Sequence, residues 1–226
     1  MRNQQGIRAA RAVWPAWILD IRIGRRMEWM QMIIGLVRHG QTEWNALGRI
    51  QGQTDIPLNE QGMKQAEALA ERLLKDGQQQ WDAVVSSDLQ RAYKTAEIIA
   101  DKLGIPLLPP DVRLRERYFG EIEGTTEAER LERWGANWHT DEGVGRETDE
   151  AVRERGGDFL LQLPYGPADR VLVVTHGSFL AQLMAHMCAH LDNQHIGNMS
   201  YSIMEYKDEV WTPLLHNCTR HLPKIV

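Results

Sequence analysis

The chain has 226 residues, of which 42% are hydrophobic and 25% are charged, values that are usual for a globular protein. This length suits one α/β domain with a sizeable core. The formal net charge of −5 argues against general nucleic-acid binding, and no apolar run reaches the ~18–20 residues that cross a membrane.

The first 31 residues differ in composition from the rest, because they hold six arginines against two acidic residues. A basic start before an apolar stretch is typical of signal peptides, but Pro15 and Asp20 interrupt this stretch and no small-residue cleavage site follows. An Arg-rich transit peptide would carry more serines. We therefore expect residues 1–31 to be an extension, either disordered or translated from a mis-assigned start, and residues 32–226 to form the domain.

The first half of the domain is predicted to alternate strands and helices. A continuous apolar run before a polar loop indicates a buried strand, and apolar residues at 3.6 spacing indicate a helix. In chain order, these patterns predict a strand at 33–37, a loop at 40–57, a helix that opens at 59–62 and ends before Gly77, a strand at 81–85, a helix capped by Ser86-Ser87-Asp88 that ends before Gly104, and a short strand at 105–108.

The second half is less regular at first and then resumes the alternation. We expect irregular chain at 114–124, a helix at 126–134, a loop at 135–146, a helix at 147–163, a strand at 170–175, a helix at 178–191, and two final strands at 200–206 and 210–215. Strands and helices that alternate in this way predict an α/β fold. We expect a three-layer sandwich, with a mostly parallel central sheet and helices on both faces.

Two of the predicted strands deliver a histidine to their carboxyl ends. Arg38-His39-Gly40 follows the first strand, and Thr175-His176-Gly177 ends the strand at 170–175. Ligands of open α/β sheets bind at this edge, so both imidazoles and Arg38 are expected to meet there. Such a group suggests an anionic ligand and a histidine that takes part in chemistry.

Four separated motifs, taken together in this order, resemble the histidine phosphatase superfamily, also called the phosphoglycerate mutase-like family. They are Arg38-His39-Gly40-x-x-Glu43-x-Asn45, Ser86-Ser87-Asp88-Leu89-x-Arg91-Ala92-x-x-Thr95-Ala96, Leu114-x-Glu116 with Phe119-Gly120 and Glu123-Gly124, and Thr175-His176-Gly177. The resemblance covers essentially all of residues 32–226. It implies a phosphoglycerate mutase-like fold and a phosphatase that acts on a small phosphomonoester.

The resemblance implies that His39 is the nucleophile and takes the phosphoryl group as a phosphohistidine. Imidazole suits this role, since near neutral pH it is largely deprotonated and nucleophilic. Phosphoryl transfer spreads charge over three equatorial oxygens, so catalysis depends on positioning and charge compensation. Arg38 and Arg91 are expected to bind the phosphate, because guanidinium donates paired hydrogen bonds and stays charged.

The remaining site residues are assigned in the same way. His176, protonated beside a bound dianion, is expected to stabilise charge on the transferring group, and Gly177 to lie against the phosphate. Asn45 would add an amide donor, although it could equally only cap its loop. Glu116 is the candidate general acid that protonates the leaving alkoxide and then activates water, with an ordinary surface carboxylate as the alternative.

The mechanism that the resemblance implies uses no metal and no organic cofactor. His186 and His190 have a metal-binding spacing on one predicted helix, but no acidic or cysteine partner accompanies them. Two cysteines, Cys188 and Cys218, give no disulfide framework and fit a reducing compartment, so we expect a cytoplasmic protein. We expect no nucleic-acid or membrane partner, and the last two strands are candidates for pairing in a homodimer.

Two other functions stay open. One is a 2,3-bisphosphoglycerate-dependent phosphoglycerate mutase, since Arg115-Glu116-Arg117-Tyr118-Phe119-Gly120 is similar to the mutase form of the acid motif. However, only 60 residues separate Glu116 from His176, where the mutases carry a longer insertion with a basic cluster, so hydrolysis is favoured. The other is a non-catalytic module that binds a phosphorylated ligand, which the presence of both histidines disfavours.

Overall fold

The computed structural model describes residues 31–76, 81–140, 142–163, 169–191 and 195–223, and the predicted extension at 1–30 lies outside this part of the chain. A five-stranded sheet in the order β2-β3-β1-β4-β5 forms its centre. The strands are β1 (Met32–Arg38), β2 (Ala83–Ser86), β3 (Arg170–Thr175), β4 (Tyr201–Lys207) and β5 (Val210–Cys218). Only β4 runs against the others, since its pairings with β1 and β5 are antiparallel. The predicted mostly parallel sheet is therefore confirmed.

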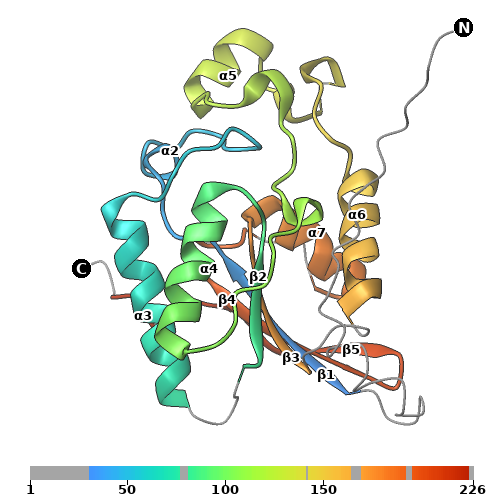
Figure 1. Ribbon diagram of the computed structural model, residues 1–226. Helices are drawn as coiled ribbons and strands as arrows, with labels where there is room; N and C mark the ends of the chain where they lie inside the picture. The colour runs from blue at the N-terminus through green and yellow to red at the C-terminus, as the bar shows by residue number, and fades with distance from the viewer. Residues whose placement is uncertain (1–30, 77–80, 141, 164–168, 192–194, 224–226) are drawn as a thin grey trace, which may run out of the picture.

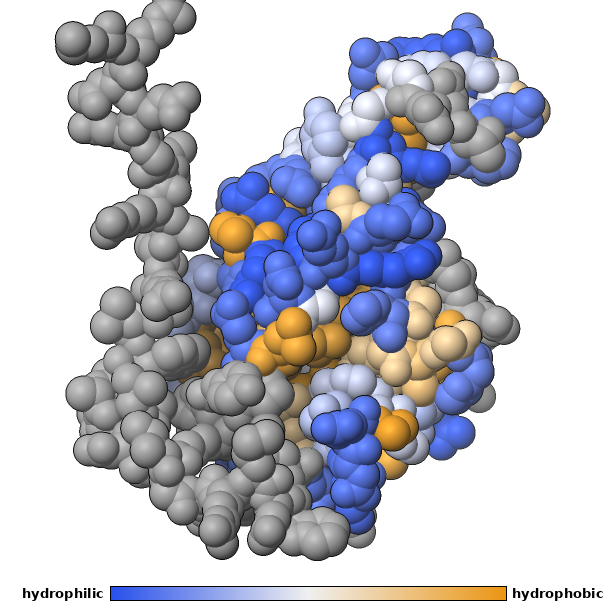
Figure 2. Space-filling view, turned by 90° about the vertical axis from the view of Figure 1, so that its right-hand side faces the viewer, coloured by the Kyte–Doolittle hydropathy of each residue, from blue (hydrophilic) through white to orange (hydrophobic). Residues whose placement is uncertain are grey.

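Helices cover both faces of this sheet, as predicted (Figure 1). The helices α3 (Glu60–Asp76) and α4 (Gln90–Leu103) pack on one face, and α6 (Asp149–Gln162) and α7 (Gly177–Met187) pack on the other. Two further helices lie beyond the carboxyl ends of the strands: the short α2 (Glu43–Ala46) and α5 (Glu127–Trp134). The segment that carries α5 stands out from the body as a largely hydrophilic projection (Figure 2).

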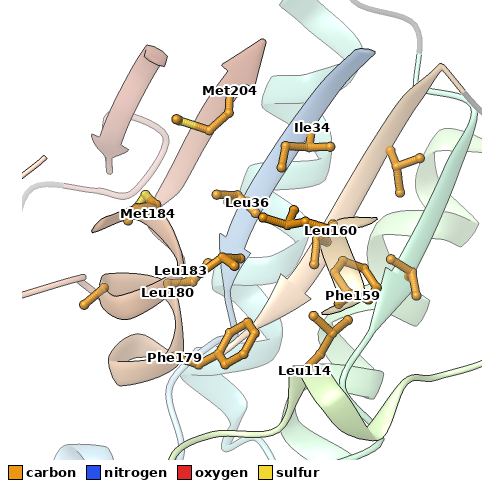
Figure 3. Packing of buried hydrophobic residues seen from close by; sticks show 14 of the residues in the cluster. Ile34, Leu36, Leu114, Phe159, Leu160, Phe179, Leu180, Leu183, Met184 and Met204 are labelled. Atoms are coloured by element: carbon orange, nitrogen blue, oxygen red, sulfur yellow. The ribbon is translucent and has the colours of Figure 1, made fainter. Parts of the chain in front are cut away.

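Alternation along the buried strands produces two separate hydrophobic cores. In β1, Ile34 and Leu36 face α6 and α7, whereas Ile33 and Val37 face α3 and α4. Figure 3 shows the first core, in which Phe159 of α6 and other apolar side chains close over the strands. Both faces of β1 are buried, which explains why its sequence is a continuous apolar run rather than an alternating one.

Gly35 interrupts this apolar run at a point where the second core leaves no room for a side chain. A Cβ atom there would lie 2.5 Å from Leu172 Cδ2 and 2.7 Å from Trp81 Cη2. The glycine therefore lets the Trp81 ring pack directly against the backbone of the central strand.

The predicted third strand at 105–108 is wrong. Only Leu107 forms a bridge, with Val84 of β2. The backbone bonds are Val84 N–H to Pro106 O (2.9 Å) and Leu108 N–H to Val84 O (2.7 Å). Pro106 has no N–H group to donate and Pro109 follows directly, so a regular ladder cannot extend past this bridge.

Other details also differ from the prediction. The helix expected at 178–191 ends at Met187, where Cys188 adopts an extended conformation. The helix expected from residue 147 begins at Asp149, because the side chain of Thr148 accepts the N–H of Ala151 and caps it there. The loop expected at 135–146 contains the 3₁₀ turns Trp138–Thr140 and Glu142–Val144.

Two global expectations bear on the same fold. Among the described residues, no helix has the length and apolar character needed to cross a membrane. The strand β5 is the outer strand of the sheet, so the predicted pairing in a homodimer concerns an edge. That pairing stays a prediction.

Candidate active site

The two predicted histidines lie side by side at the carboxyl edge of the sheet. In the parallel pairing of β1 and β3, Arg38 lies opposite Thr175, so the next residues, His39 and His176, are also neighbours. The His39 N–H group donates to Thr175 O at 2.9 Å, and the imidazole centroids are 5.1 Å apart at an interplanar angle of 59°. The strand register therefore sets the spacing of the two rings.

Both ring nitrogens of His39 have a partner, a backbone carbonyl for Nδ1 and an arginine for Nε2. The side chain is 2% exposed, and Nδ1 lies 2.7 Å from Gly40 O. A carbonyl only accepts, so this contact assigns the proton to Nδ1 and the lone pair to Nε2. Burial first, and then the positive charges of Arg91 and Arg38, hold the pKa of His39 well below its usual value. His39 is therefore a neutral imidazole with its lone pair on Nε2, the form that acts as a nucleophile.

Arg91 is completely buried at the start of α4 and has three directed contacts. Its Nε donates to His39 Nε2 at 3.3 Å, Nη1 donates to Thr54 O at 3.1 Å, and Nη2 donates to Gly52 O at 2.6 Å. Burial is the main cause that lowers the pKa of Arg91 to about 10, so the guanidinium is still charged at neutral pH. The site thus holds a fixed cation against the candidate nucleophile.

Thr95, a residue of the second sequence motif, links α4 to the loop after His39. Its hydroxyl donates to Arg91 O at 2.7 Å and accepts the Gly40 N–H at 3.2 Å. This pair of bonds ties the backbone of Arg91 to Gly40, the residue next to His39, through Thr95, which is 55 positions from Gly40 in the sequence.

The predicted cap of α4 by Ser86-Ser87-Asp88 is wrong. Leu89 occupies the cap position and its side chain makes no capping bond. The Gln90 N–H group instead donates at 2.8 Å to Asp55, which lies in the distant loop after β1. Asp88 forms an ion pair with Arg115 at 2.5 Å. The carboxylate of Asp55 thus caps the N-terminus of α4 in place of the local serines.

Several buried polar atoms beside His39 have no hydrogen-bond partner among the described residues. These are both ring nitrogens of His176 and Nε of Arg38, whose Nη1 donates to Ile196 O at 2.5 Å. Gly177 adjoins them, and a Cβ atom there would lie 3.1 Å from Arg38 Nε. Buried donors normally find acceptors, so this cluster is the part of the site that a bound anion would satisfy.

His176 is fully buried at the N-terminus of α7 and is surrounded by positive charge. Burial, followed by the charges of Arg91, His39, Arg38 and Arg155, holds the pKa of His176 well below its usual value. The free site therefore keeps His176 neutral. A bound dianion would reverse the local charge and favour the protonated ring, as predicted for its role.

Glu116 lies against α7 rather than on the surface. Its carboxylate is 5% exposed and accepts N–H groups of Arg117 (2.8 Å), Phe179 (2.8 Å) and Ser178 (3.1 Å). It therefore supplies acceptors for two of the otherwise unpaired N–H groups in the first turn of α7. The alternative of an ordinary surface carboxylate is wrong, and its role as an acid stays a prediction.

The Asn45 amide is used within its own loop. Its Oδ1 accepts from Thr42 N at 3.2 Å in a capping box of α2 and from Asn198 Nδ2 at 3.0 Å. Its Nδ2 donates to Gln51 Oε1 at 3.3 Å. The capping alternative is thus what the structure shows, and donation to phosphate stays a prediction.

The sequence analysis missed residues whose contacts span the site. Asn198 donates toward the carbonyls of His39 (3.4 Å) and Gly40 (3.5 Å). Glu123, quoted only as part of a motif, accepts four hydrogen bonds from around residues 53–54 and 119. Neither residue has a local pattern that reveals these contacts, because most of the partners, including Gln53 and Thr54 for Glu123, are distant in the sequence.

A metal centre finds no support in the part of the chain that the structure describes. That part holds no group of three or more His, Cys, Asp and Glu side chains placed to bind an ion. His190 lies 3.9 Å from the thiol of Cys188, without a third ligand. The cations of the site are supplied by arginine.

Comparisons with known proteins agree with this geometry. A family model described as histidine phosphatase superfamily (branch 1) matches residues 34–219. The "uncharacterized phosphatase PhoE" of Bacillus subtilis is 36% identical over 192 residues, covering 83% of this chain and 95% of that protein. A "metal-independent phosphoserine phosphatase" of Arabidopsis thaliana is 36% identical over 187 residues, covering 79% and 78%.

Two further relatives extend the comparison. A "probable phosphoglycerate mutase GpmB" of Yersinia pestis is 36% identical over 192 residues, covering 78% of this chain and 86% of that protein. The solved structure of Bacillus stearothermophilus YhfR superimposes with a TM-score of 0.75 at 29% identity, covering 84% of this chain and 98% of that one.

Proposed function

This chain belongs to the histidine phosphatase superfamily, and we propose on that premise that it hydrolyses small phosphomonoesters through a phosphohistidine at His39. One observation carries the proposal. A buried, neutral imidazole points its unprotonated Nε2 at a buried guanidinium, beside buried donors of Arg38 and His176 that lack acceptors. Nucleophile and anion-binding groups are thus preorganised in one place.

In the first step, the Nε2 lone pair of His39 attacks phosphorus and the ester P–O bond breaks. Glu116 donates a proton to the leaving alkoxide, which departs as an alcohol. In the second step, Glu116 takes a proton from water, the resulting hydroxide attacks phosphorus, and the P–N bond breaks to release phosphate. Arg38, Arg91 and His176 compensate the charge on the equatorial oxygens in both steps.

We propose that the reaction needs no metal, since arginine and histidine side chains supply the charge compensation. A 36% identical relative is named a metal-independent phosphoserine phosphatase, which supports this. We further propose that residues 32–226 are the catalytic domain. A cytoplasmic location is proposed from the two free cysteines, Cys188 and Cys218.

The test is hydrolysis of a phosphomonoester panel in the presence of a chelator. The panel contains p-nitrophenyl phosphate, phosphoserine and 3-phosphoglycerate, the last with and without 2,3-bisphosphoglycerate. Phosphate release that requires His39 and ignores the bisphosphate is the expected result. A labelled phosphoenzyme, stable to alkali and labile to acid, would identify the P–N bond.

A mutase is the second candidate, because one 36% identical relative is named a probable phosphoglycerate mutase. A mutase returns the phosphoryl group to another hydroxyl of the substrate and needs a bisphosphorylated primer to load His39. Isomerisation of 3-phosphoglycerate that depends on the primer would establish it. If the folded protein binds phosphate but turns over nothing, a binding module is the remaining function.

A further inference from the structure

The guanidinium of Arg91 is oriented by a loop and not by an acidic side chain. Two backbone carbonyls, those of Gly52 and Thr54, accept from its Nη2 and Nη1. Backbone carbonyls can fix an arginine only if the loop that carries them is itself fixed. The contacts on the other side of this loop therefore decide where Arg91 points.

Glu123 supplies those contacts. Its carboxylate accepts the N–H groups of Gln53 (3.0 Å) and Thr54 (2.9 Å) and the hydroxyl of Thr54 (2.6 Å). Gly52 packs so closely that a Cβ atom there would overlap the Glu123 carboxylate. The loop at 52–54 is thus clamped between Glu123 on one side and Arg91 on the other.

The same carboxylate also belongs to the segment that carries the candidate acid. Glu123 accepts the Phe119 N–H at 3.1 Å, and Gln53 Nε2 donates to the carbonyl of Glu116 at 3.1 Å. One carboxylate therefore joins the loop that orients Arg91 to the chain that positions Glu116. Its charge also favours the protonated form of Arg91.

We propose that Glu123 is a positioning residue for phosphoryl transfer, which holds the Gly52 and Thr54 carbonyls where they direct Arg91 toward His39. The inference rests on the proposed function, because it gives Arg91 the task of binding the phosphoryl group. Arginine binds phosphate through a rigid planar fork, so a small rotation of this fork weakens both of its hydrogen bonds. The substitution of a residue that never touches substrate should therefore weaken phosphate binding.

The deciding variant is Glu123→Gln. The amide keeps the size of the side chain. However, it replaces one of the two carboxylate oxygens by an NH₂ group, which cannot accept the hydrogen bonds that this oxygen accepts in the wild type. We expect the dissociation constant of inorganic phosphate, measured by calorimetry, and the KM of p-nitrophenyl phosphate to rise about tenfold, the loss expected for charged hydrogen bonds. Glu129→Gln is the matched control, because Glu129 also accepts a backbone N–H, that of Thr126 at 2.7 Å, but lies in α5. We expect less than a twofold change in it.

A double-mutant cycle separates positioning from general loosening of the fold. If Glu123 acts through Arg91, Glu123→Gln should have no further effect on phosphate binding once Arg91 is replaced by Ala. An equal loss in both backgrounds, or unchanged phosphate binding in Glu123→Gln itself, would overturn the inference. Should Glu123→Gln not fold, Thr54→Ala removes one of the four bonds, and the same cycle with Arg91→Ala decides the question.

The two hypotheses fail in different ways. Wild-type protein that binds phosphate but hydrolyses nothing would overturn the proposed function and leave the role of Glu123 in phosphate binding standing. If the wild type is active and Glu123→Gln binds phosphate as tightly as the wild type does, only the inference about Glu123 is overturned and the proposed function stands.

Discussion

His39 and His176 share burial and a lowered pKa but differ in their bonding. His39 is locked by Gly40 O and Arg91, which fixes its tautomer, whereas His176 has no partner at either nitrogen among the described residues. The bonding of His39 fits its proposed role as nucleophile, because its lone pair has one direction. The lack of partners at His176 fits its proposed role of taking up a proton when an anion binds. Neighbouring positions in one sheet register thus offer two different bonding environments.

Replacement of His39 by Ala should abolish turnover and keep the fold. The acceptor of the phosphoryl group is lost, so we expect kcat for p-nitrophenyl phosphate to fall by about 10⁴-fold or more. The check is phosphate release beside circular dichroism and thermal melting of the same sample. Retained turnover in a folded variant would remove His39 as the nucleophile.

Both histidines should make stability depend on pH in a defined direction. Their folded-state pKa values lie well below the usual histidine value of 6.5, so at pH below 6.5 the unfolded chain binds protons that the folded chain does not. The contribution of the two histidines to the free energy of unfolding should therefore be fully present above pH 6.5. It should decrease as the pH falls from 6.5 toward the folded-state pKa values. The slope is about 1.4 kcal/mol per pH unit for each histidine.

Urea unfolding at pH 7.5 and 5.5 measures this slope. His221 also has a lowered pKa, so the comparison is between wild type and a variant with both His39 and His176 replaced by Ala. The variant should lose less stability between the two pH values than the wild type. Equal losses would mean that the two rings are not held neutral by the fold.

Phosphate binding should take up protons, since a dianion raises the pKa of His176 from its lowered value in the free site. The measurement is calorimetry near pH 6.5 in buffers of different ionisation enthalpy. Phosphate itself releases protons when it binds as a dianion, and this release is the same in both proteins. We therefore expect the net number of protons taken up to be larger in wild type than in His176→Asn. No difference between the two proteins would show that His176 does not meet the anion in protonated form.

At the scale of elements, the predictable features were those carried by local pattern. The apolar runs of β1 and β3, each ending in a histidine, placed both rings at one edge because register and edge follow from the strands themselves. The strand predicted at 105–108 was wrong, because the segment has the apolar composition of a strand but its prolines prevent a regular ladder of backbone hydrogen bonds. The apolar residues indicated a strand, although Pro106 and Pro109 already lack the N–H groups that a regular ladder needs.

The contacts that complete the site were not predictable in this way. Asp55 caps α4, Glu116 caps α7, and Glu123 clamps the loop at 52–54. Each joins residues that are distant in sequence, so no spacing rule indicates the partner. The sequence therefore predicted that His39, Arg91 and His176 lie close together, as the structure shows, but it did not predict the bonds that hold them.

Glu116→Gln tests both the contact of Glu116 with the N-terminus of α7 and its proposed role as proton donor. As a proton donor, Glu116 should matter most for poor leaving groups, so we expect alkyl phosphates to slow by about 10²-fold or more and p-nitrophenyl phosphate much less. Stability should fall by about 1 kcal/mol, since the carboxylate caps α7. Equal slowing of both substrate types would remove Glu116 as the acid.

Gly35→Ala should destabilise the sheet at its centre. The added methyl group would meet Leu172 and Trp81 at less than 3 Å, and overpacking of this kind costs about 1–3 kcal/mol. Gly197→Ala is the control, because its Cβ atom would have only Thr219 nearby, at 3.7 Å. Urea unfolding should separate the two variants, and equal stabilities would mean that the core around Trp81 adjusts without strain.

At the scale of the whole molecule, we predict that the chain shortened to start at Met32 keeps its activity. The first strand begins at Met32, and the family match begins at residue 34. The expected result is an unchanged kcat/KM and a melting temperature within ~2 °C, since every helix and strand in the described part of the chain is kept. A large loss of either would show that residues 1–31 belong to the working domain.

The pairing of β1 with β3 has a consequence for how the protein is made. β1 ends at residue 38 and β3 opens at residue 170, so a chain that grows from its N-terminus carries His39 and Arg91 long before His176 exists. Closing such a distant contact is a slow, topology-limited event in folding. Because the proposed site needs both histidines, we expect hydrolysis to return during refolding only after β1 has paired with β3, so that the regain of activity reports when these two strands meet.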